Sequence, residues 1–517
     1  MEIDYIDKKW SVYACLVISF IFFLLLFRWP LLPNFLDIYY HLLIARGFDK
    51  AAGFVTSDFL QYAPLGRPHL YPPFFHFVIL SLMKLGFSPL FIGRLLDVCI
   101  FPLFLAVIWF FISSLFSKRL AFFAVLISAS LYSFYLGTSN FMPVTVAFIF
   151  GLLSLLAQEK GKIISAILLL ALSFYTHAQI PWLFVVVYIV YGALNRARFR
   201  SCLSVVLFSL LVSGPILLYL FKNRSFYRYA CAGEHFVLEI NLLLILSLGA
   251  FNKVFKDKGR YYLLFALAVS TLPFIFSYPY RYISGQGLLG LIFLASISAD
   301  RIYAMANRFL VLHSLQQASS LLIILIIIIF TFFSPTLLIT REKTWKFLPF
   351  NSTYLNLTAL NKNAIRPNDY SIASSRYITE LVRLIQKNTH NNDIIFTNLN
   401  FVGTMLAVLS DRADSKGMLS EVGLGIKPDP ISNARLVIWF KNLDAPEDER
   451  LAEVISRYKL KKITETEIAY IYKNDLTNAS ISLRKADIPN KIIIGIMLLV
   501  SFLLAMDLFR LVSFFGS

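Results

Sequence analysis

The stretch that decides the fold is SVYACLVISFIFFLLLFRWPLLPNFLDIYYH, which covers residues 11–41. Residues 11–27 carry no charge, and their length suits a membrane-spanning helix, which needs about 17–25 mostly apolar residues. The run follows Lys8 and Lys9 and lacks a small-residue cleavage site, so we expect a retained anchor, not a removed signal peptide. The first helix therefore brings Asp37, ten residues later, close to the membrane surface.

The rest of the chain repeats this apolar pattern. Its 517 residues are 58% hydrophobic and only 15% charged, with a mean hydropathy of +0.69, whereas soluble domains average roughly 25% charged residues. The composition therefore indicates a polytopic α-helical membrane protein and excludes a soluble enzyme, a disordered regulator and a disulfide scaffold. Its four cysteines form no disulfide framework, because three lie in apolar runs. About twelve transmembrane helices are predicted, near residues 11–27, 91–116, 119–136, 141–157, 162–178, 180–195, 202–220, 236–252, 260–277, 284–300, 318–338 and 490–513.

The net charge is +18, and the positive residues lie in the short loops between the apolar runs. If the N-terminus is cytoplasmic, alternate loops should be rich in Lys and Arg. They are, so both termini are predicted to be cytoplasmic in a multi-pass protein of the cell membrane. Because topology accounts for the positive charge, nucleic acid is not expected as a partner. The basic positions are Lys118, Arg119, Lys160, Lys162, Arg196, Arg198, Arg200, Lys253, Lys256, Lys258, Arg260, Arg301, Arg308 and Arg510.

The polar segments then fall on the outer side of the membrane. A multi-span core covers residues 1–338 and includes a long first outer loop at 28–90, followed by short outer turns such as 133–140. Residues 339–488 form a polar stretch whose alternating patterns predict a small extracytoplasmic α/β domain, and residues 489–517 hold the last helix. Strands are expected at Asp393–Thr397, Ala434–Phe440 and Glu467–Tyr472, and helices at Ile378–Lys387, Phe401–Leu409 and Glu447–Tyr458.

The first outer loop gathers residue types that can carry chemistry. Asp37 and His41 lie at the membrane–water interface, where partial desolvation can tune the pKa of a carboxyl group. Asp58, Arg67 and His69 follow in a short segment that ends in Tyr-Pro-Pro, after which a short helix from Pro73 to about Leu85 is expected at the interface. The structural alternatives are an interfacial acid among belt tyrosines and a proline-rich loop tip.

Arg281 is the strongest site outside this loop. It lies in Tyr-Pro-Tyr-Arg-Tyr at the outer end of a span, and its planar guanidinium suits phosphate oxygens. The alternative is an ordinary arginine of an aromatic belt. Glu234 lies in a further outer loop, at 221–235. His177, at another outer helix end, is interpreted as a packing or capping residue.

These motifs resemble a known family. Asp37-x-x-x-His41 after a first span, followed by Pro-Leu-Gly-Arg67 and Tyr-Pro-Pro, resembles the first outer loop of the C-type membrane glycosyltransferases, the GT-C superfamily. Archaeal oligosaccharyltransferases are the nearer branch, and the protein-mannosyltransferase and aminoarabinose-transferase branch is more distant. The resemblance implies transfer of a sugar from a polyprenyl-phosphate or polyprenyl-diphosphate carrier to a protein or glycan acceptor on the outer face. It also implies that Asp37 is a general base or a ligand of Mg²⁺ or Mn²⁺, and that Arg281 binds the donor phosphate.

The sequence also departs from this family. The Trp-Trp-Asp-Tyr-Gly motif of oligosaccharyltransferases is absent, and the second outer loop, Leu136 to Asn140, has no carboxylate. Sequon recognition is therefore unsupported, and a metal site at Asp37 would need Glu234 or Asp58 to complete it. We therefore interpret the chain as having the architecture of this superfamily but a different acceptor.

Physical requirements favour the same interpretation. A lipid-linked donor needs an apolar groove, interfacial cations for its phosphate and an acid to activate the acceptor. Asp37 would take the proton, while Arg281 with Arg67 or His69 would neutralise the leaving phosphate. A transporter or flippase is the competing hypothesis, but it predicts charged or broken helices at the midplane and two matching halves. A non-catalytic scaffold for surface-polymer assembly is the third hypothesis.

Overall fold

The computed structural model describes most of the chain. Glu234 and most of the predicted span 490–513 lie outside the described residues. These are residues 2–33, 37–226, 238–257, 259–275, 281–282, 285–312, 316–339, 344–365, 375–418, 429–441, 448–489, 491–493, 495–496, 500 and 503.

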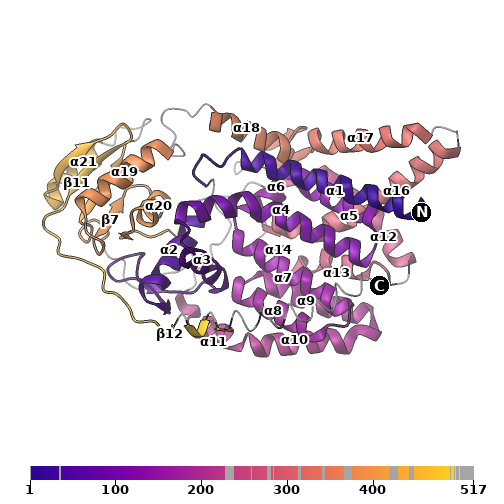
Figure 1. The fold of residues 1–517 in the computed structure, drawn as a ribbon, viewed down its shortest axis with the longest axis horizontal. Helices are drawn as coiled ribbons and strands as arrows, with labels where there is room; N and C mark the ends of the chain where they lie inside the picture. The colour runs from indigo at the N-terminus through magenta and orange to yellow at the C-terminus, as the bar shows by residue number, and fades with distance from the viewer. Residues whose placement is uncertain are drawn as a thin grey trace.

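Long helices run side by side along the molecule, and an α/β layer lies at one end of them (Figure 1). The start of α1 lies at the opposite end. In the described part of the chain, four helices are long and apolar enough to cross a membrane, or five if one pair bent by 61° is a single span. The full count of twelve therefore stays a prediction. The four spans are Lys8–Leu26 in α1 (Glu2–Leu26), α4 (Pro89–Leu115), α7 (Met142–Glu159) and Gln286–Leu310 in α16 (Leu289–Leu312) with the turn before it; the bent pair is Arg196–Val212, which includes α10 (Phe199–Val212), with α11 (Gly214–Lys222).

Shorter helices fill the bundle between these spans. One large core joins them, and Phe104, Phe134 and Phe148 are completely or almost completely buried in it. Aromatic side chains bury large areas and dominate such contacts. The shorter helices are α5 (Lys118–Ser130), α8 (Ile163–Thr176), α9 (Ile180–Leu194), α12 (Leu246–Lys256), α13 (Tyr262–Val269), α14 (Leu272–Ile275) and α17 (Gln316–Phe332).

Two sequence predictions are wrong at the outer ends of the helices. Residues 133–140 were expected to be a turn, but α6 (Tyr132–Ser139) occupies them, because Phe134 and Tyr135 are buried in the core of the helix bundle. The predicted span 236–252 begins as strand β4 (Leu238–Asn241) and continues as a short helix η3 (Leu242–Ile245) before α12. Backbone pairing decides this, since β4 joins β5 (Thr336–Ile339) and β6 (Trp345–Leu348) in an antiparallel sheet.

The polar C-terminal stretch folds around a five-stranded sheet in the order β10–β11–β9–β7–β8. Strands β8 and β9 pair with β7 in parallel, and β9, β11 and β10 pair antiparallel. All three strands and all three helices predicted from the sequence form, within a few residues of the expected bounds. They are β7 (Ile394–Thr397), β9 (Leu436–Phe440), β11 (Ala469–Lys473), α19 (Ser375–Asn388), α20 (Asn400–Ser410) and α21 (Asp448–Tyr458), to which the structure adds α18 (Thr353–Ile365), β8 (Ala413–Asp414) and β10 (Lys461–Glu465).

The first outer loop is itself folded and lies between the bundle and the sheet. Helix α3 begins after Pro73, as predicted, and α2 packs against both α3 and α20. Side chains of α2, α3, α20, β7 and β9 share one hydrophobic core. The loop therefore belongs to the same packed unit as the α/β layer. Its elements are α2 (Asp37–Lys50), β1 (Gly53–Phe54), β2 (Ser57–Asp58), β3 (Arg67–Pro68) and α3 (Phe74–Lys84).

Backbone pairing extends this union at the edge of the sheet. Gln61 forms a parallel bridge with Asp414, so the loop continues the sheet beyond β8. The N–H of Asp414 donates to the carbonyl of Leu60 at 2.8 Å, and the N–H of Ala63 donates to the carbonyl of Asp414 at 3.1 Å. The side-chain oxygen of Gln61 accepts the N–H of Met418 at 3.0 Å. These bonds cover a strand edge that would otherwise be open to pairing.

Candidate functional site

Two helices of the first outer loop bring histidines together. His41 lies one turn after Asp37 on α2, and His76 lies on the buried face of α3 with Phe75 and Ile79. Nδ1 of His41 and Nε2 of His76 are 2.9 Å apart, so one ring donates a hydrogen bond to the other. Both side chains are buried. The pairing fixes how α2 and α3 face each other.

His69 completes a buried group of three imidazoles. Its ring centroid lies 5.2 Å from that of His76 and 5.3 Å from that of Phe48. Neither ring nitrogen of His69 has a hydrogen-bond partner in the structure. Burial, and to a smaller extent neighbouring basic side chains, lowers the pKa of both His41 and His69 to about 3, so both are neutral at physiological pH. Unpaired buried nitrogens cost stability and are therefore uncommon.

Tyr71 links these imidazoles to the helix bundle. Its ring lies 4.9 Å from that of His41 and 6.0 Å from that of His177, which follows the end of α8. Nδ1 of His177 accepts the backbone N–H groups of Gln179 and Ile180 at 3.1 and 3.2 Å. His177 thus caps the start of α9, as the sequence predicted. Three of the seven histidines of the chain, His41, His76 and His177, contact Tyr71, and a fourth, His69, packs on His76.

Arg281 reaches the same region from the other side of the bundle. Its guanidinium lies 4.6 Å from the centre of the Phe141 ring, and its side chain is half-buried. Burial lowers the pKa of His177, and the positive charge of Arg281 lowers it as well. An arginine in an aromatic, partly desolvated setting keeps its charge and can bind an anion strongly.

Asp58 and Arg67 form a buried ion pair at the outer end of the loop. They face each other across the short β2–β3 pairing, and Nε of Arg67 lies 3.4 Å from the Asp58 carboxylate. Burial raises the pKa of Asp58 to about 6, although Arg67 opposes this. The guanidinium of Arg67 also lies over the rings of Tyr40 and Tyr62, at 5.7 and 5.0 Å. This packing gives the pair a structural task in shaping the loop.

Asp37 is the first residue of α2 and is half-buried. The N-terminal end of a helix carries partial positive charge, which stabilises a carboxylate there. Most other residues of α2 are buried, so the helix holds Asp37 in a fixed place at the edge of the loop. Asp37 and His41 therefore lie on the same face of one rigid helix.

A metal site at Asp37 finds no support in this part of the chain. Among the described residues, no three or more His, Cys, Asp or Glu side chains are grouped so that they could hold a metal ion. Asp58 forms an ion pair with Arg67, and Glu234 lies outside the described residues. No step is therefore derived through a metal.

The structure thus connects most of the predicted residues. Ring contacts, a cation–π contact and an ion pair connect His177, Tyr71, His41, Tyr40, Arg67 and Asp58 in this order. The positive charge of Arg281 acts on His177, at the start of this series. Sequence reasoning did not select His76 and Tyr71. The signal for His76 was a polar residue on the apolar face of a short helix, where a histidine needs a partner.

Comparison with known proteins gives matches in structure alone. No protein-family profile matches the chain, and no curated protein matches its sequence. The oligosaccharyltransferase of Archaeoglobus fulgidus in complex with Zn and sulfate shares 12% identity, with a TM-score of 0.52 over 90% of this chain and 74% of that one. AglB from the same organism, in complex with an inhibitory peptide and a dolichol-phosphate, shares 10% identity, with a TM-score of 0.55 over 91% and 75%.

A bacterial structure matches over its full length. ArnT from Cupriavidus metallidurans, bound to undecaprenyl phosphate, shares 13% identity, with a TM-score of 0.53 over 92% of this chain and 100% of that chain. Oligosaccharyltransferases and ArnT are both GT-C glycosyltransferases. The structural similarity extends over the helix bundle and the α/β layer. The chain therefore has a GT-C-like fold.

Proposed function

We propose that this protein is a membrane glycosyltransferase that moves a sugar from a polyprenyl-phosphate-linked donor to an acceptor on the extracytoplasmic side. The observation that carries the proposal is the first outer loop, where Asp37 begins a buried helix whose next turn places His41 against Tyr71, the ring that also contacts His177. The GT-C-like fold supports it.

The chemistry assigns separate roles to Asp37 and Arg281. The acceptor hydroxyl attacks the anomeric carbon of the donor sugar, and the bond from that carbon to the phosphate oxygen breaks. Asp37 takes the proton of the hydroxyl as general base. The leaving polyprenyl phosphate carries the new negative charge, which Arg281 neutralises. The balance is one glycosidic bond formed, one glycosyl phosphate bond broken and one proton transferred.

The neighbouring structures support the class of donor. ArnT is bound to undecaprenyl phosphate, and AglB is in complex with a dolichol-phosphate and a peptide. Both ligands are polyprenyl phosphates, so a carrier of this chemical class suits the fold. By the same likeness, the acceptor is a protein or a glycan.

Asp58, Arg67, His41 and His69 are assigned to shaping the donor site. Their burial and mutual packing hold α2 and the Asp58–Arg67 segment in place. Burial keeps both imidazoles neutral, and Arg67 is paired with Asp58, so Arg281 is the positive charge assigned to the donor phosphate. This division fits a site that must bind an anion on one side only.

The test compares Asp37→Asn with Asp49→Asn in protein reconstituted into lipid. Both residues lie on α2, but Asp49 lies in the last turn, is partly exposed and pairs with Lys84. Release of carrier phosphate from a mixture of polyprenyl-phosphate and polyprenyl-diphosphate sugars should fall by 100-fold or more in Asp37→Asn, in the range of about 10²–10⁴ for a lost general base. Asp49→Asn should keep its activity.

Arg281→Gln adds a second readout. It should weaken binding of the donor more than it changes binding of a neutral acceptor. If no donor is consumed by the wild type, or if both α2 variants release carrier phosphate equally, the assignment fails and a transporter or a non-catalytic scaffold becomes the better hypothesis.

A further inference from the structure

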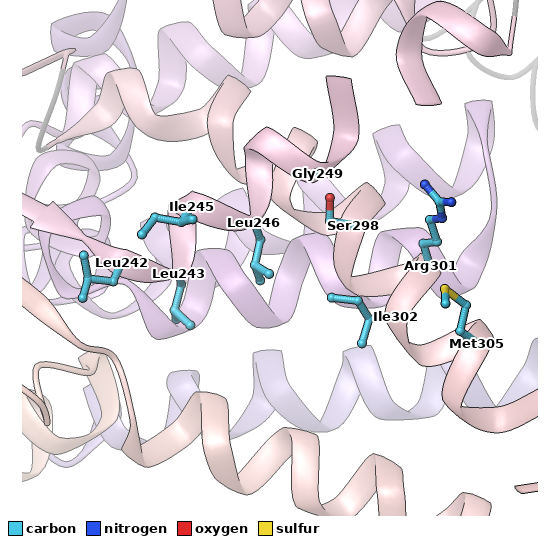
Figure 2. A pocket seen from close by; sticks show the side chains of 9 residues that line it. All are labelled: Leu242, Leu243, Ile245, Leu246, Gly249, Ser298, Arg301, Ile302 and Met305. Atoms are coloured by element: carbon cyan, nitrogen blue, oxygen red, sulfur yellow. The ribbon is translucent and has the colours of Figure 1, made fainter. Parts of the chain in front are cut away.

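A long groove opens on the helix bundle, away from the first outer loop. It lies between α16 on one side and η3 with α12 on the other, and its volume is about 570 Å³. Figure 2 shows the lining side chains in a row along these elements, with Leu242 at one end and Arg301 and Met305 at the other. This volume lies within the range of about 300–1,000 Å³ that is usual for ligand pockets.

The lining is apolar except near one end. Leu242, Leu243, Leu246 and Ile302 supply most of it, and Ile302 is 55% exposed. At the middle of the groove a Cβ on Gly249 would lie only 2.9 Å from Oγ of Ser298, so α12 and α16 are in close contact there and close the floor. A flexible apolar chain can therefore lie along the groove but cannot pass between the two helices.

The charged group of the groove is Arg301. Its side chain is exposed and forms no hydrogen bond or ion pair with any residue that the structure describes. The carboxylate beside it on α16, Asp300, is already bound by Arg119. Arg301 thus offers an uncompensated positive charge at one end of an apolar trough.

The depth of Arg301 follows from its neighbours. Lys118 and Arg119 are the first two residues of α5. Tyr303 packs on Trp10, which follows Lys9, with ring centroids 5.2 Å apart. These lysines and arginines mark the cytoplasmic surface by the positive-inside rule. The other end of the groove lies at Leu242, directly after β4. Strand β4 pairs with β5, which follows the C-terminal end of α17.

We propose that this groove binds an anionic phospholipid of the cytoplasmic leaflet, with its phosphate at Arg301 and one acyl chain along η3 and α12. The charge of Arg301 complements a phosphate, and cytoplasmic leaflets are rich in anionic lipids. The donor carrier is a less suitable occupant, because its phosphate belongs near Arg281, at the other membrane surface. The proposal does not depend on the glycosyltransferase activity.

The experiment measures lipid retention by native mass spectrometry of the full-length protein. Delipidated protein receives phosphatidylglycerol or phosphatidylcholine with identical acyl chains. Phosphatidylglycerol should bind about fivefold more tightly, the ratio expected for one basic residue at a membrane surface. Arg301→Gln should abolish this preference. Arg308→Gln, which removes an exposed charge from the same helix outside the groove, should keep it.

A second variant tests the position of the chain. Leu246→Trp fills the groove without changing charge and should lower retention of both lipids, and a thermal-melting scan confirms that each variant is folded. Equal binding of the two lipids, or an equal loss in Arg301→Gln and Arg308→Gln, would overturn the proposal. Displacement of phosphatidylglycerol by equimolar polyprenyl phosphate would also overturn it and would assign the groove to the donor carrier.

Discussion

At the residue scale, the outer part of the molecule depends on a few buried polar groups. Asp58 is balanced by Arg67, whereas Asp414 has no arginine and is held by the Thr404 hydroxyl and the N–H of Lys416, each at 3.0 Å. Burial raises the pKa of both carboxyl groups to about 6. Removing one partner of a buried ion pair is costly, typically about 3–5 kcal/mol, because the other charge stays uncompensated.

Asp414 makes stability depend on pH. Its pKa is about 6 in the folded protein against an ordinary 3.8, so the proton binds more tightly to the folded state. The resulting stabilisation is complete below about pH 3.8 and is lost as the pH rises through 6, in total about 3 kcal/mol at about 1.4 kcal/mol per pKa unit. The melting temperature of the wild type should therefore fall between about pH 4 and about pH 6.5 and change little above that range.

Asp414→Asn should reduce this slope and raise the melting temperature at pH 8. The amide resembles the protonated acid, since its oxygen can accept from Lys416 and its nitrogen can donate to Thr404. Part of the slope remains, because Asp58 titrates in the same direction. Asp411→Asn is the control, since Asp411 is a partly exposed carboxylate three residues earlier, and it should leave the slope as in the wild type. An unchanged slope in Asp414→Asn would contradict the assignment.

At the element scale, helices with a regular apolar spacing were easier to predict than short elements. The apolar spacing of residues 378–387, 401–409 and 447–458 located three helices to within a few residues. In contrast, α6 and β4 were missed, because a short helix rich in Ser and Tyr and a four-residue strand gain their stability from neighbours. The start of α9 was predicted correctly, since Pro181 separates its apolar run from the preceding one.

His177 should contribute to stability through the cap. His177→Ala leaves the N–H groups of Gln179 and Ile180 without their acceptor and should cost about 1 kcal/mol. His177→Asn keeps a side-chain oxygen at this position and should retain most of the stability. Thermal melting in the same detergent compares the two. If both variants lose equal stability, packing against Tyr71 and not capping is the main role of His177.

At the scale of the whole molecule, the first outer loop and the α/β layer are one unit. They share a hydrophobic core and a continuous sheet, and β1 also pairs with β12 (Ile488–Pro489) just before the last segment of the chain. The Asp487 carboxylate accepts both the N–H and the hydroxyl of Thr56 at 2.8 Å. Residues more than 400 positions apart are thereby fixed together. The loop that carries Asp37 cannot rearrange without disturbing this layer.

Substitution of Gly417 tests whether the first outer loop and the α/β layer form one unit. It has a φ of +68°, and a Cβ there would lie 2.4 Å from the ring of Tyr62 in the loop. Gly417→Ala should therefore open the contact and speed proteolysis of residues 58–68. Gly86→Ala is the matched control, because Gly86 also has a positive φ, +91°, but open space around it. Both variants lose about 1–2 kcal/mol to backbone strain, and Gly417→Ala should lose about 1–3 kcal/mol more from the clash.

Proteolysis separates the two effects. Cleavage in the loop should increase in Gly417→Ala and stay at the wild-type rate in Gly86→Ala. Equal cleavage of both variants would mean that backbone strain, and not the contact with Tyr62, controls the loop.

The sequence by itself predicted a helical membrane protein and a candidate location for its chemistry. Long apolar runs are typical of membrane-spanning helices, and short apolar runs bounded by polar residues located strands such as β7 and β9, which are buried along their whole length. Asp37 after a first span was enough to place the candidate site in the first outer loop. Only the tertiary structure decided that Asp58 pairs with Arg67, that three histidines contact Tyr71 and that the loop extends the sheet at Asp414. Those contacts join residues far apart in the chain, and local periodicity carries no information about which distant groups burial will bring together.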